Sequence, residues 1–311
     1  MNKKYDLVIL GSGPAGITAG IYAMRAQLKT LLLEKNYITG GQMLNTYEVD
    51  NYPGMPLISG SDLSEAFEEH AKRLGLAIQQ GEVSNIIHEG HSFHIQTEQD
   101  SYVADSVIIA TGTRHRLLDV PGEKNLAGMG VSYCATCDGA FFKDKTVAVA
   151  GGGDTAVEDA LFLSRICKKV YLIHRRDQLR AAKILQDRLA KQENVEILWN
   201  CEINEIVGEQ QVSGVEIFHN KEGNYTGLDV DGVFVAIGSL PNSHGLGHIA
   251  DTDSNGYFIA GEDCKTSTPG IFTAGDIRAK ALRQIVTAVA DGANAATSAF
   301  RYLVDLHKNC Q

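Results

Sequence analysis

The sequence predicts an α/β fold of two Rossmann-like domains, each in the three-layer ββα arrangement, with the second domain inserted into the first. A glycine-rich turn stands twice between an apolar run and a helical pattern, at residues 11–16 and 151–156. A second apolar run then ends at Glu34 or at His174, in both cases 23 residues after the first glycine of the turn. This order of strand, turn, helix and strand is typical of βαβ units that hold a dinucleotide.

The pattern of apolar residues predicts each element of the two units. We expect strands over 5–10 and 30–33 around a helix over 17–26, and strands over 146–150 and 170–173 around a helix over 157–164. Two matching segments, 107–112 and 233–238, are strand-like runs that end in glycine, and each would carry the chain out of its unit. We therefore predict one domain from residues 1–113 and 246–311 and an inserted domain from residues 114–245, with crossings near Thr113 and Gly245.

Length and composition narrow the class of protein. The 311 residues suffice for two domains of roughly 150 residues each. The net charge of −10 argues against a protein that follows nucleic-acid phosphates. No apolar run reaches the ~18 residues that span a bilayer, and a strand pattern begins at Tyr5, so we expect neither a membrane span nor a signal peptide. The six cysteines form no secreted disulfide framework, so a cytoplasmic location is expected.

The first glycine turn has the residues that a dinucleotide requires. Gly11 permits the tight turn, Gly13 lets a pyrophosphate approach the backbone, and Gly16 lets helix and strand pack closely. Glu34 stands where a carboxylate accepts hydrogen bonds from ribose hydroxyls. Because FAD and NAD(H) both carry free ribose hydroxyls, these residues alone leave the choice between them open.

The second glycine turn differs from the first at the ribose position. Gly151, Gly153 and Ala156 repeat the turn, but the following strand ends in basic residues, namely His174, Arg175 and Arg176, with Arg180 nearby. Guanidinium groups bind phosphate with two parallel hydrogen bonds, whereas an acid would repel it. The pattern predicts a pocket for a 2′-phosphate and hence NADP(H). The alternative is a solvated basic patch that also includes Lys168, Lys169 and Lys183.

A Cys-Ala-Thr-Cys string lies between the two glycine turns. Cys134 and Cys137 are close enough in sequence to form a disulfide, and Asp138 follows at once. Such a pair suits thiol–disulfide exchange, and a neighbouring carboxyl group can move the proton that a thiolate gains or loses. The alternative is half of a zinc site, which needs two further ligands.

The remaining cysteines and histidines supply no such ligands. We expect Cys167, Cys201 and Cys264 to be small buried side chains and Cys310 to belong to a mobile tail. The ten histidines lack metal-ligand spacing, so no metal site is predicted.

A chain that binds a hydride donor and also carries a redox dithiol requires a carrier that accepts the hydride and passes electrons to the disulfide. Flavin does both. We therefore predict that FAD, tightly bound without a covalent bond, occupies the domain of residues 1–113 and 246–311. NADPH is then the substrate of the domain of residues 114–245, which also carries Cys134 and Cys137.

Motifs occur along essentially the whole chain. Besides the two glycine turns they are Gly40-Gly41-Gln42, Asn51-Tyr52-Pro53-Gly54, Ala110-Thr111-Gly112, Cys134-Ala135-Thr136-Cys137-Asp138-Gly139, His174-Arg175-Arg176-Asp177, Ala236-Ile237-Gly238, Thr273-Ala274-Gly275-Asp276 and Arg283-Gln284. Together they make the chain resemble the bacterial-type, low-molecular-weight thioredoxin reductases of the class II pyridine nucleotide–disulfide oxidoreductases. The Cys-Ala-Thr-Cys-Asp string combined with both turns is the specific part of this pattern.

The resemblance implies a full set of cofactor-binding residues. For FAD they are Gly11, Gly13, Pro14, Ala15, Gly16, Glu34, Lys35, Gly41, Gln42, Asn51, Ala110, Thr111, Gly112, Gly275, Asp276, Arg283, Gln284 and Ile285. For NADPH they are Gly151, Gly153, Asp154, Thr155, Ala156, His174, Arg175, Arg176, Arg180, Ile237 and Gly238. Asp276 is expected at the ribityl–phosphate part of the flavin, and residues 283–285 along its isoalloxazine ring.

The resemblance also implies an NADPH-dependent thioredoxin-disulfide reductase that is a homodimer. Electrons would pass from NADPH through FAD to the Cys134–Cys137 disulfide and then to thioredoxin, with Asp138 as the acid–base group. Cys137 is expected nearer the flavin, while either cysteine can be drawn as the one that attacks thioredoxin. The two domains would rotate relative to each other between the half-reactions, about the crossings near Thr113 and Gly245.

Two departures from the usual family pattern and three alternatives accompany this interpretation. Residues 239–242 read Ser-Leu-Pro-Asn where many relatives have His-Ser-Pro-Asn, and Asp154 replaces the commoner Asn.

The alternatives are a relative that reduces peroxiredoxins, a ferredoxin-dependent relative without NADPH, and a flavin-binding redox sensor without catalysis. Arg175, Arg176 and Arg180 argue against the second, and the intact dithiol with Asp138 argues against the third.

Overall fold

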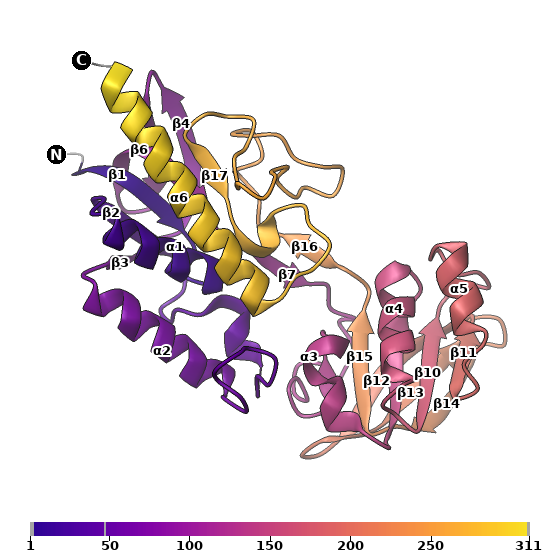
Figure 1. The fold of residues 1–311 in the computed structure, drawn as a ribbon. Coiled ribbons are helices and arrows are strands. Elements are labelled where there is room, and N and C mark those ends of the chain that lie inside the picture. The colour runs from indigo at the N-terminus through magenta and orange to yellow at the C-terminus, as the bar shows by residue number, and fades with distance from the viewer. Residues whose placement is uncertain (1–2, 47, 310–311) are drawn as a thin grey trace. The chain divides into compact units, whose positions relative to one another are not determined.

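The computed structural model describes residues 3–46 and 48–309, so Cys310 lies outside the described part of the chain. The backbone forms two compact units (Figure 1). Unit 1 comprises Met1–Arg114 and Leu240–Gln311, and unit 2 comprises His115–Ser239, which interrupts unit 1 in the sequence.

Unit 1 is built on a seven-stranded sheet. Across the sheet lie β3 (Ala77–Gln80), β2 (Thr30–Glu34), β1 (Lys3–Leu10), β6 (Ser101–Ile109), β5 (Ser92–Thr97) and β4 (Val83–Glu89), while β17 (Ile271–Thr273) pairs with the last residues of β6. The strands β3, β2, β1, β6 and β17 are parallel, whereas β5 and β4 extend the sheet in antiparallel fashion. The helical elements are α1 (Pro14–Arg25), η1 (Gly41–Asn45), α2 (Gly60–Arg73), η3 (Gly275–Ile277) and α6 (Ile285–Asn309).

Alternate residues of β1 face two different layers, as the pleat of a strand requires. Leu7 and Ile9 pack in a core with residues of α1 and α6, and α1 and α6 lie side by side over this face (Figure 1). Val8 and Leu10 pack in a second core with residues of β5, β6 and the loop around Phe258. Helices therefore cover one face of the unit 1 sheet, and residues from the β5–β4 end of the same sheet pack in the core on the other face.

Unit 2 repeats this layering. Its parallel sheet consists, in order, of β11 (Val195–Trp199), β10 (Lys169–His174), β9 (Thr146–Gly151), β15 (Gly232–Ala236) and β8 (Val131–Ser132), and its antiparallel sheet of β12 (Cys201–Gly208), β13 (Val212–His219) and β14 (Asn224–Asp229). The helical elements are α3 (Ala135–Asp138), η2 (Gly139–Phe142), α4 (Asp154–Leu163) and α5 (Lys183–Leu189). Val147 and Val149 of β9 pack with the helices, while Ala148 and Ala150 pack with β12 and β13.

Both helices that come after a glycine turn begin earlier than the sequence pattern predicted. The structure starts α1 at Pro14 and α4 at Asp154, three residues ahead of the predicted first residues in each case. The physical reason is the tightness of the turn, since Gly13 and Gly153 are themselves the N-cap residues. Proline at the first helical position is favourable because its missing N–H would have no partner there.

The chain passes between the units twice. Along these passages β7 (Thr113–His115) and β16 (Ser239–Pro241) pair as a two-stranded sheet. Asn242 belongs to the Ser-Leu-Pro-Asn segment that differs from the usual family pattern. It makes two hydrogen bonds with Thr111 of unit 1: Thr111 Oγ1 donates to the Asn242 carbonyl, and Asn242 Nδ2 donates to the Thr111 carbonyl, each at 2.9 Å.

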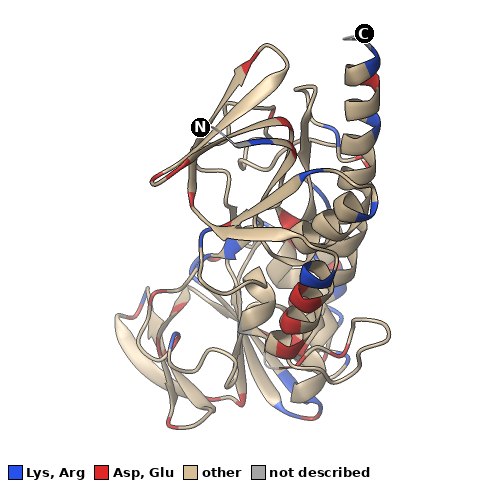
Figure 2. Ribbon diagram, turned by 90° about the vertical axis from the view of Figure 1, so that its left-hand side faces the viewer, with Lys and Arg blue, Asp and Glu red and all other residues tan. Residues whose placement is uncertain are grey.

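Charged residues of both signs are interspersed along the ribbon (Figure 2). Among the described residues, no helix has the length and apolar character needed to cross a bilayer. The same part of the chain contains no group of three His, Cys, Asp or Glu residues able to hold a metal ion. Cys167, Cys201 and Cys264 are buried free cysteines, as predicted.

A buried ionic cluster ties α6 to the loop after η3. Asp291 of α6 accepts hydrogen bonds from Arg278 (2.9 and 3.1 Å), from Lys280 (2.8 Å) and from the backbone N–H of Gly275 (3.0 Å). The three charged side chains are only 4%, 7% and 8% exposed. Burial opposes the charge of Asp291, but the hydrogen bonds from Arg278 and Lys280 outweigh it and hold its pKa below the ordinary value.

Replacing Asp291 by Ala should lower the free energy of unfolding by about 3 kcal/mol or more, because it leaves two buried cations without their counter-charge. Chemical unfolding followed by far-UV circular dichroism measures the change. The matched control is Asp305→Ala on the same helix, where the side chain is 75% exposed and the cost should stay below about 0.5 kcal/mol. Equal losses in the two variants would contradict the importance of the cluster.

Candidate functional site

The first glycine turn leaves almost no space at two of its three glycines. Gly11 has φ of +100°, and a Cβ there would lie 2.5 Å from the carbonyl oxygen of Ala110. A Cβ on Gly16 would collide with the carbonyl oxygen of Gly11. At Gly13 a Cβ would have no neighbouring atom within 4 Å, so the N-terminus of α1 is open where a pyrophosphate would bind.

Glu34 ends β2 beside this turn, and its buried carboxylate is already held by four donors. Oε2 accepts hydrogen bonds from the backbone N–H (2.9 Å) and the hydroxyl (2.6 Å) of Ser12. Oε1 accepts from the backbone N–H (2.9 Å) and Nδ2 (3.0 Å) of Asn36. Because a carboxylate accepts about four hydrogen bonds, a ribose hydroxyl would replace one of these side-chain donors.

Segments that are far apart in the sequence converge on the first turn. A Cβ on Gly41 would lie 3.4 Å from Cα of Gly13, and a Cβ on Gly275 would lie 2.8 Å from Cβ of Ala15. The structure therefore brings together the glycines of three separate predicted motifs. Of the other residues predicted for FAD, Pro14 begins α1, Lys35 is exposed after β2, Gly112 follows β6 and Ile285 begins α6.

Three amide side chains predicted at the flavin are paired within unit 1. Asn51 Nδ2 donates to Gln284 Oε1 at 3.1 Å, which joins the loop after η1 to the start of α6. Gln42 Nε2 donates to Thr113 Oγ1 at 2.9 Å.

Asp276 has a buried carboxylate oxygen, Oδ1, for which no hydrogen-bond donor is found among the described residues. Burial raises the pKa of Asp276, while Lys280 and Arg283 act in the opposite direction. Arg283 donates from Nε to the Asp276 carbonyl (3.2 Å), and its guanidinium lies 4.3 Å from the Tyr257 ring centroid. A buried acceptor without a donor fits a ligand that brings hydroxyl groups, as the ribityl chain of a flavin does.

The second glycine turn has the same construction. Gly151 has φ of +154°, and a Cβ there would lie 2.5 Å from the carbonyl oxygen of Ala236, which corresponds to Ala110 in the first unit. Gly153 has open space at its Cβ position, as Gly13 does. Ala156 is buried at the third position of the motif. Unit 2 therefore offers a second cradle for a pyrophosphate at the N-terminus of α4.

The His174 side chain packs against the second glycine turn. Its ring is buried and occupies the space that a side chain at Gly152 would need, and Nε2 lies 2.9 Å from the Gln178 carbonyl. Burial lowers the pKa of His174, and the charges of Arg176 and Arg180 act in the same direction. These contacts fix the His174 ring against Gly152 of the turn, and its part in NADPH binding stays a prediction.

The arginines predicted for the 2′-phosphate are exposed and come after β10. Arg175, Arg176 and Arg180 all present their side chains to solvent, and the backbone N–H of Arg180 donates to the Gly152 carbonyl at 2.7 Å. Asp154, the departure from the usual Asn, accepts a hydrogen bond from the N–H of Ala182 (2.7 Å). Arg180 is thus joined to the turn through its backbone, and the additional carboxylate of Asp154 is engaged by the backbone of Ala182.

Three residues predicted for NADPH complete the placement in unit 2. Thr155 is exposed in the first turn of α4, Ile237 is half-buried after β15, and the Gly238 carbonyl accepts a hydrogen bond from Arg116 N–H at 3.0 Å.

The redox cysteines lie at α3, shortly after β8: Cys134 is the N-cap of α3, and Cys137 lies within it. Cys134 and Cys137 form a disulfide with their Cα atoms 5.3 Å apart, and both are half-buried. The Cys134 carbonyl accepts hydrogen bonds from the N–H groups of Cys137 (3.2 Å) and Asp138 (3.1 Å), which builds this turn of helix. Because both sulfur atoms bond to each other, the half-zinc-site alternative does not apply to this state of the pair.

Asp138 is the acid nearest to the disulfide in sequence, and it has a specific partner. The Ser132 hydroxyl donates to Oδ2 of Asp138 at 2.5 Å and accepts from the N–H of Cys134 at 3.1 Å. Burial raises the pKa of Asp138, and the hydrogen bond from Ser132 partly reverses this. A carboxyl group with a raised pKa can hold a proton nearer to neutral pH, as an acid–base group must.

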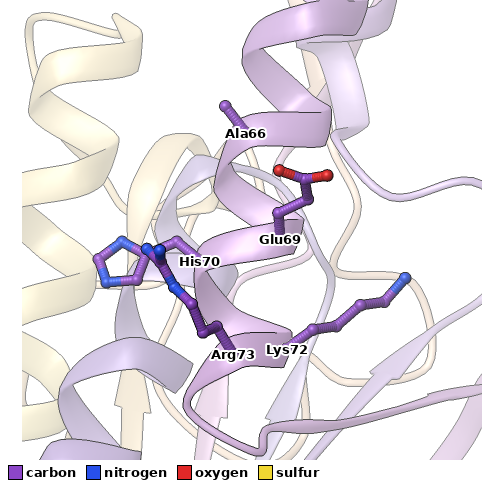
Figure 3. A pocket seen from close by; sticks show the side chains of 5 residues that line it. All are labelled: Ala66, Glu69, His70, Lys72 and Arg73. Atoms are coloured by element: carbon purple, nitrogen blue, oxygen red, sulfur yellow. The ribbon is translucent and has the colours of Figure 1, made fainter.

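A shallow hollow of about 400 Å³ on α2 is unrelated to these residues. It is lined by Ala66, Glu69, His70, Lys72 and Arg73 (Figure 3), none of which was predicted to bind a cofactor. Charged side chains of both signs, Glu69, Lys72 and Arg73, line it.

Sequence reasoning missed three groups of supporting residues. Ser12 and Asn36 hold Glu34, Ser132 holds Asp138, and Asp291 holds the Gly275 N–H. Ser12 and Asn36 lie near predicted residues in sequence and could have been suspected. No sequence pattern marks Ser132. Asp291 stands in a cofactor-like stretch, Gly270 to Asp276 and on to Asp291-Gly292, but its contacts could not be read from the sequence because its partners become neighbours only on folding.

Comparison with known proteins agrees with this site. A family model described as pyridine nucleotide-disulphide oxidoreductase matches residues 5–292. Thioredoxin reductase of Listeria monocytogenes is 45% identical over 99% of this chain and 97% of its own length, and that of Bacillus subtilis is 45% identical over 98% and 97%. The crystal structure of thioredoxin reductase from Streptococcus pyogenes is 45% identical, with a TM-score of 0.94 over 98% of this chain and 100% of that chain. The chain therefore belongs to the pyridine nucleotide-disulphide oxidoreductase family, among its low-molecular-weight thioredoxin reductases.

Proposed function

We propose that this protein is an NADPH-dependent thioredoxin reductase with FAD as its bound cofactor. The observation that carries the proposal is the Cys134–Cys137 disulfide beside Asp138, in the same compact unit as the second glycine turn. Unit 1 is the proposed FAD domain and unit 2 the proposed NADPH domain. The similarity to thioredoxin reductases supports thioredoxin as the substrate.

The residues of unit 1 favour FAD over NAD(H). Gly13 and Glu34 suit the pyrophosphate and ribose of either dinucleotide, whereas Oδ1 of Asp276, which has no donor among the described residues, suits a ribityl hydroxyl that NAD(H) lacks. Asn51, Gln42, Arg283 and Gln284 are the residues proposed to contact the rest of the flavin. When bound, the flavin supplies a carrier that accepts a hydride from NADPH and delivers an electron pair to a disulfide.

The dithiol and Asp138 account for the second half of the reaction. Two electrons break the Cys134–Cys137 bond and leave two sulfurs that need protons, and Asp138 can supply one of them. A thiolate of the pair then attacks the thioredoxin disulfide, and the second thiol of the pair resolves the mixed disulfide. The net change is oxidation of NADPH to NADP⁺, consumption of one proton and reduction of one thioredoxin disulfide to a dithiol.

The finer parts of the proposal are rotation of unit 2 about the β7 and β16 passages, a homodimer and a cytoplasmic location. Rotation is proposed because one dithiol has to meet both the flavin and thioredoxin. Sedimentation equilibrium tests the dimer directly: a monomer mass at micromolar concentration would contradict it.

Anaerobic NADPH should bleach the flavin absorbance of the purified protein, and added thioredoxin should then become reduced. Cys134→Ser and Cys137→Ser should retain bleaching and lose transfer to thioredoxin, because the dithiol acts after the flavin. Cys167→Ala, which removes a buried free cysteine of the same unit, should retain both activities. Bleaching without reduction of any thioredoxin would refute the assigned substrate.

The open Cβ positions at Gly13 and Gly153 allow a test of the two dinucleotide sites. Alanine fits at either position without a clash, so each variant should fold. Gly13→Ala should weaken FAD binding and Gly153→Ala should weaken NADPH binding, each about tenfold or more, because the added methyl crowds the pyrophosphate. Flavin content and NADPH affinity are measured in both variants, and each serves as the control for the other. A loss of the same dinucleotide in both would contradict the assignment of the two units.

Arg175→Ala and Arg176→Ala should each raise KM for NADPH about tenfold or more while leaving KM for NADH unchanged. The reason is the loss of a charge-assisted hydrogen bond to the 2′-phosphate, worth about 1.5–3 kcal/mol. Lys183→Ala is the matched control, since it removes an exposed positive charge that pairs with Asp187. Parallel rises of KM for both coenzymes would contradict the 2′-phosphate pocket.

A further inference from the structure

Ser132 is a buried polar residue next to the dithiol to which the proposed reaction gives no role. It is 5% exposed and ends β8, two residues before Cys134. Its backbone is aligned with Phe234 in the parallel pairing of β8 with β15, so the central sheet of unit 2 fixes its position. A side chain mounted in this way has little freedom to move and can hold a partner accurately.

The Ser132 hydroxyl joins both ends of the redox turn. It accepts the N–H of Cys134 (3.1 Å) at the start of the turn and lies 2.5 Å from Asp138 Oδ2 at its end. A second acceptor for its proton, the Cys134 carbonyl, lies 3.3 Å away. A distance of 2.5 Å is typical of a hydroxyl that donates to a charged carboxylate.

A serine hydroxyl has one proton and two lone pairs, so this arrangement has two complete states. When Asp138 is ionised, Ser132 donates to it. When Asp138 is protonated, its own O–H can donate to Ser132, whose proton then turns to the Cys134 carbonyl. In both states the N–H of Cys134 keeps its acceptor, and neither state leaves a buried polar group without a partner.

We propose that Ser132 is a positioning residue whose hydroxyl holds Asp138 against the redox turn in both protonation states of the carboxyl group. The proposal rests on the acid–base role given to Asp138 under the proposed function. Ser132 makes no bond to the reacting sulfur atoms and acts through Asp138 and through the backbone of Cys134.

The other ionisable groups near Asp138 do not account for the shift of its pKa. α3 packs against η2 and α4; η2 carries no ionisable side chain, and the acids of α4 are Asp154, Glu158 and Asp159. Of the groups in the described structure, burial raises the pKa of Asp138, and the Ser132 hydrogen bond is the one contact that acts against it. After reduction the thiols of Cys134 and Cys137 join this set, which is the reason to test the oxidised protein first.

The test is a pH titration of the Asp138 carboxyl group in the oxidised holoenzyme labelled with ¹³C-aspartate. The Asp138 signal is identified by its disappearance in Asp138→Asn. Ser132→Ala should move the midpoint upward by about one pH unit or more, because burial then acts without the opposing hydrogen bond to the charged form. Ser132→Thr, which keeps the hydroxyl and suits a strand, should restore a midpoint close to that of the unmodified protein.

The matched control for this titration is a serine at the end of α4. Ser164→Ala removes a hydroxyl that bonds the Leu161 carbonyl at the end of α4, and it should leave the Asp138 midpoint unchanged. An unchanged or lower midpoint in Ser132→Ala, or an equal shift in Ser132→Thr, would overturn the proposal.

Turnover with NADPH and thioredoxin provides the second measurement. In Ser132→Ala the limb of the pH profile that depends on Asp138 should move to higher pH, in the same direction as the carboxyl titration. A carboxyl shift in a protein that fails to reduce thioredoxin would leave the Ser132 role standing and refute the proposed function instead. A normal titration in an active enzyme would refute the Ser132 role alone.

Discussion

The close approach of strand and helix at each glycine turn is the constraint on which the two sites depend. Because Gly16 has no side chain, α1 can pack against the Gly11 carbonyl. The positive φ of Gly11 likewise lets the turn lie close to the Ala110 carbonyl. Any side chain at these points would push the helix away from the sheet. The helix N-terminus would then move away from Gly13, the one position of the turn that is left open for a phosphate.

Unit 2 meets the same constraint with the same backbone, so the difference between the sites lies elsewhere. Gly151 and Ala236 reproduce the contact of Gly11 with Ala110. Within the turn, Asp154 and Ala156 stand where the first unit has Pro14 and Gly16, and at the end of the second strand Glu34 is replaced by His174 and the arginines after it. Under the proposed function, one backbone design would hold both dinucleotides, and the side chains at the strand end would select the one that carries a 2′-phosphate.

The fold was predictable because its causes are local in the sequence, while the binding roles of the site residues stay predictions. The parallel strands β1, β2, β9 and β10 are short apolar runs, and glycine turns mark the ends of β1 and β9 at a fixed distance from the ends of β2 and β10. The helix starts were predicted too late, because apolar periodicity cannot detect that Gly13 and Gly153 are already N-caps. The contacts of Ser132 and Asp291 could not be predicted, since the partners of each are brought near by folding.

The carboxylates of the two units show why such partners matter to function. Asp291 has two cations and a backbone N–H, and the hydrogen bonds from these cations outweigh its burial, so it stays charged and acts as a structural anchor. The pKa of Asp138 is raised by burial, and one neutral hydroxyl is its opposing partner, so its charged and protonated forms are closer in free energy. This difference suits Asp138, rather than Asp291, to the acid–base role that the proposed function gives it. The number and charge of the donors around a buried carboxylate thus separate a structural acid from one that can serve catalysis.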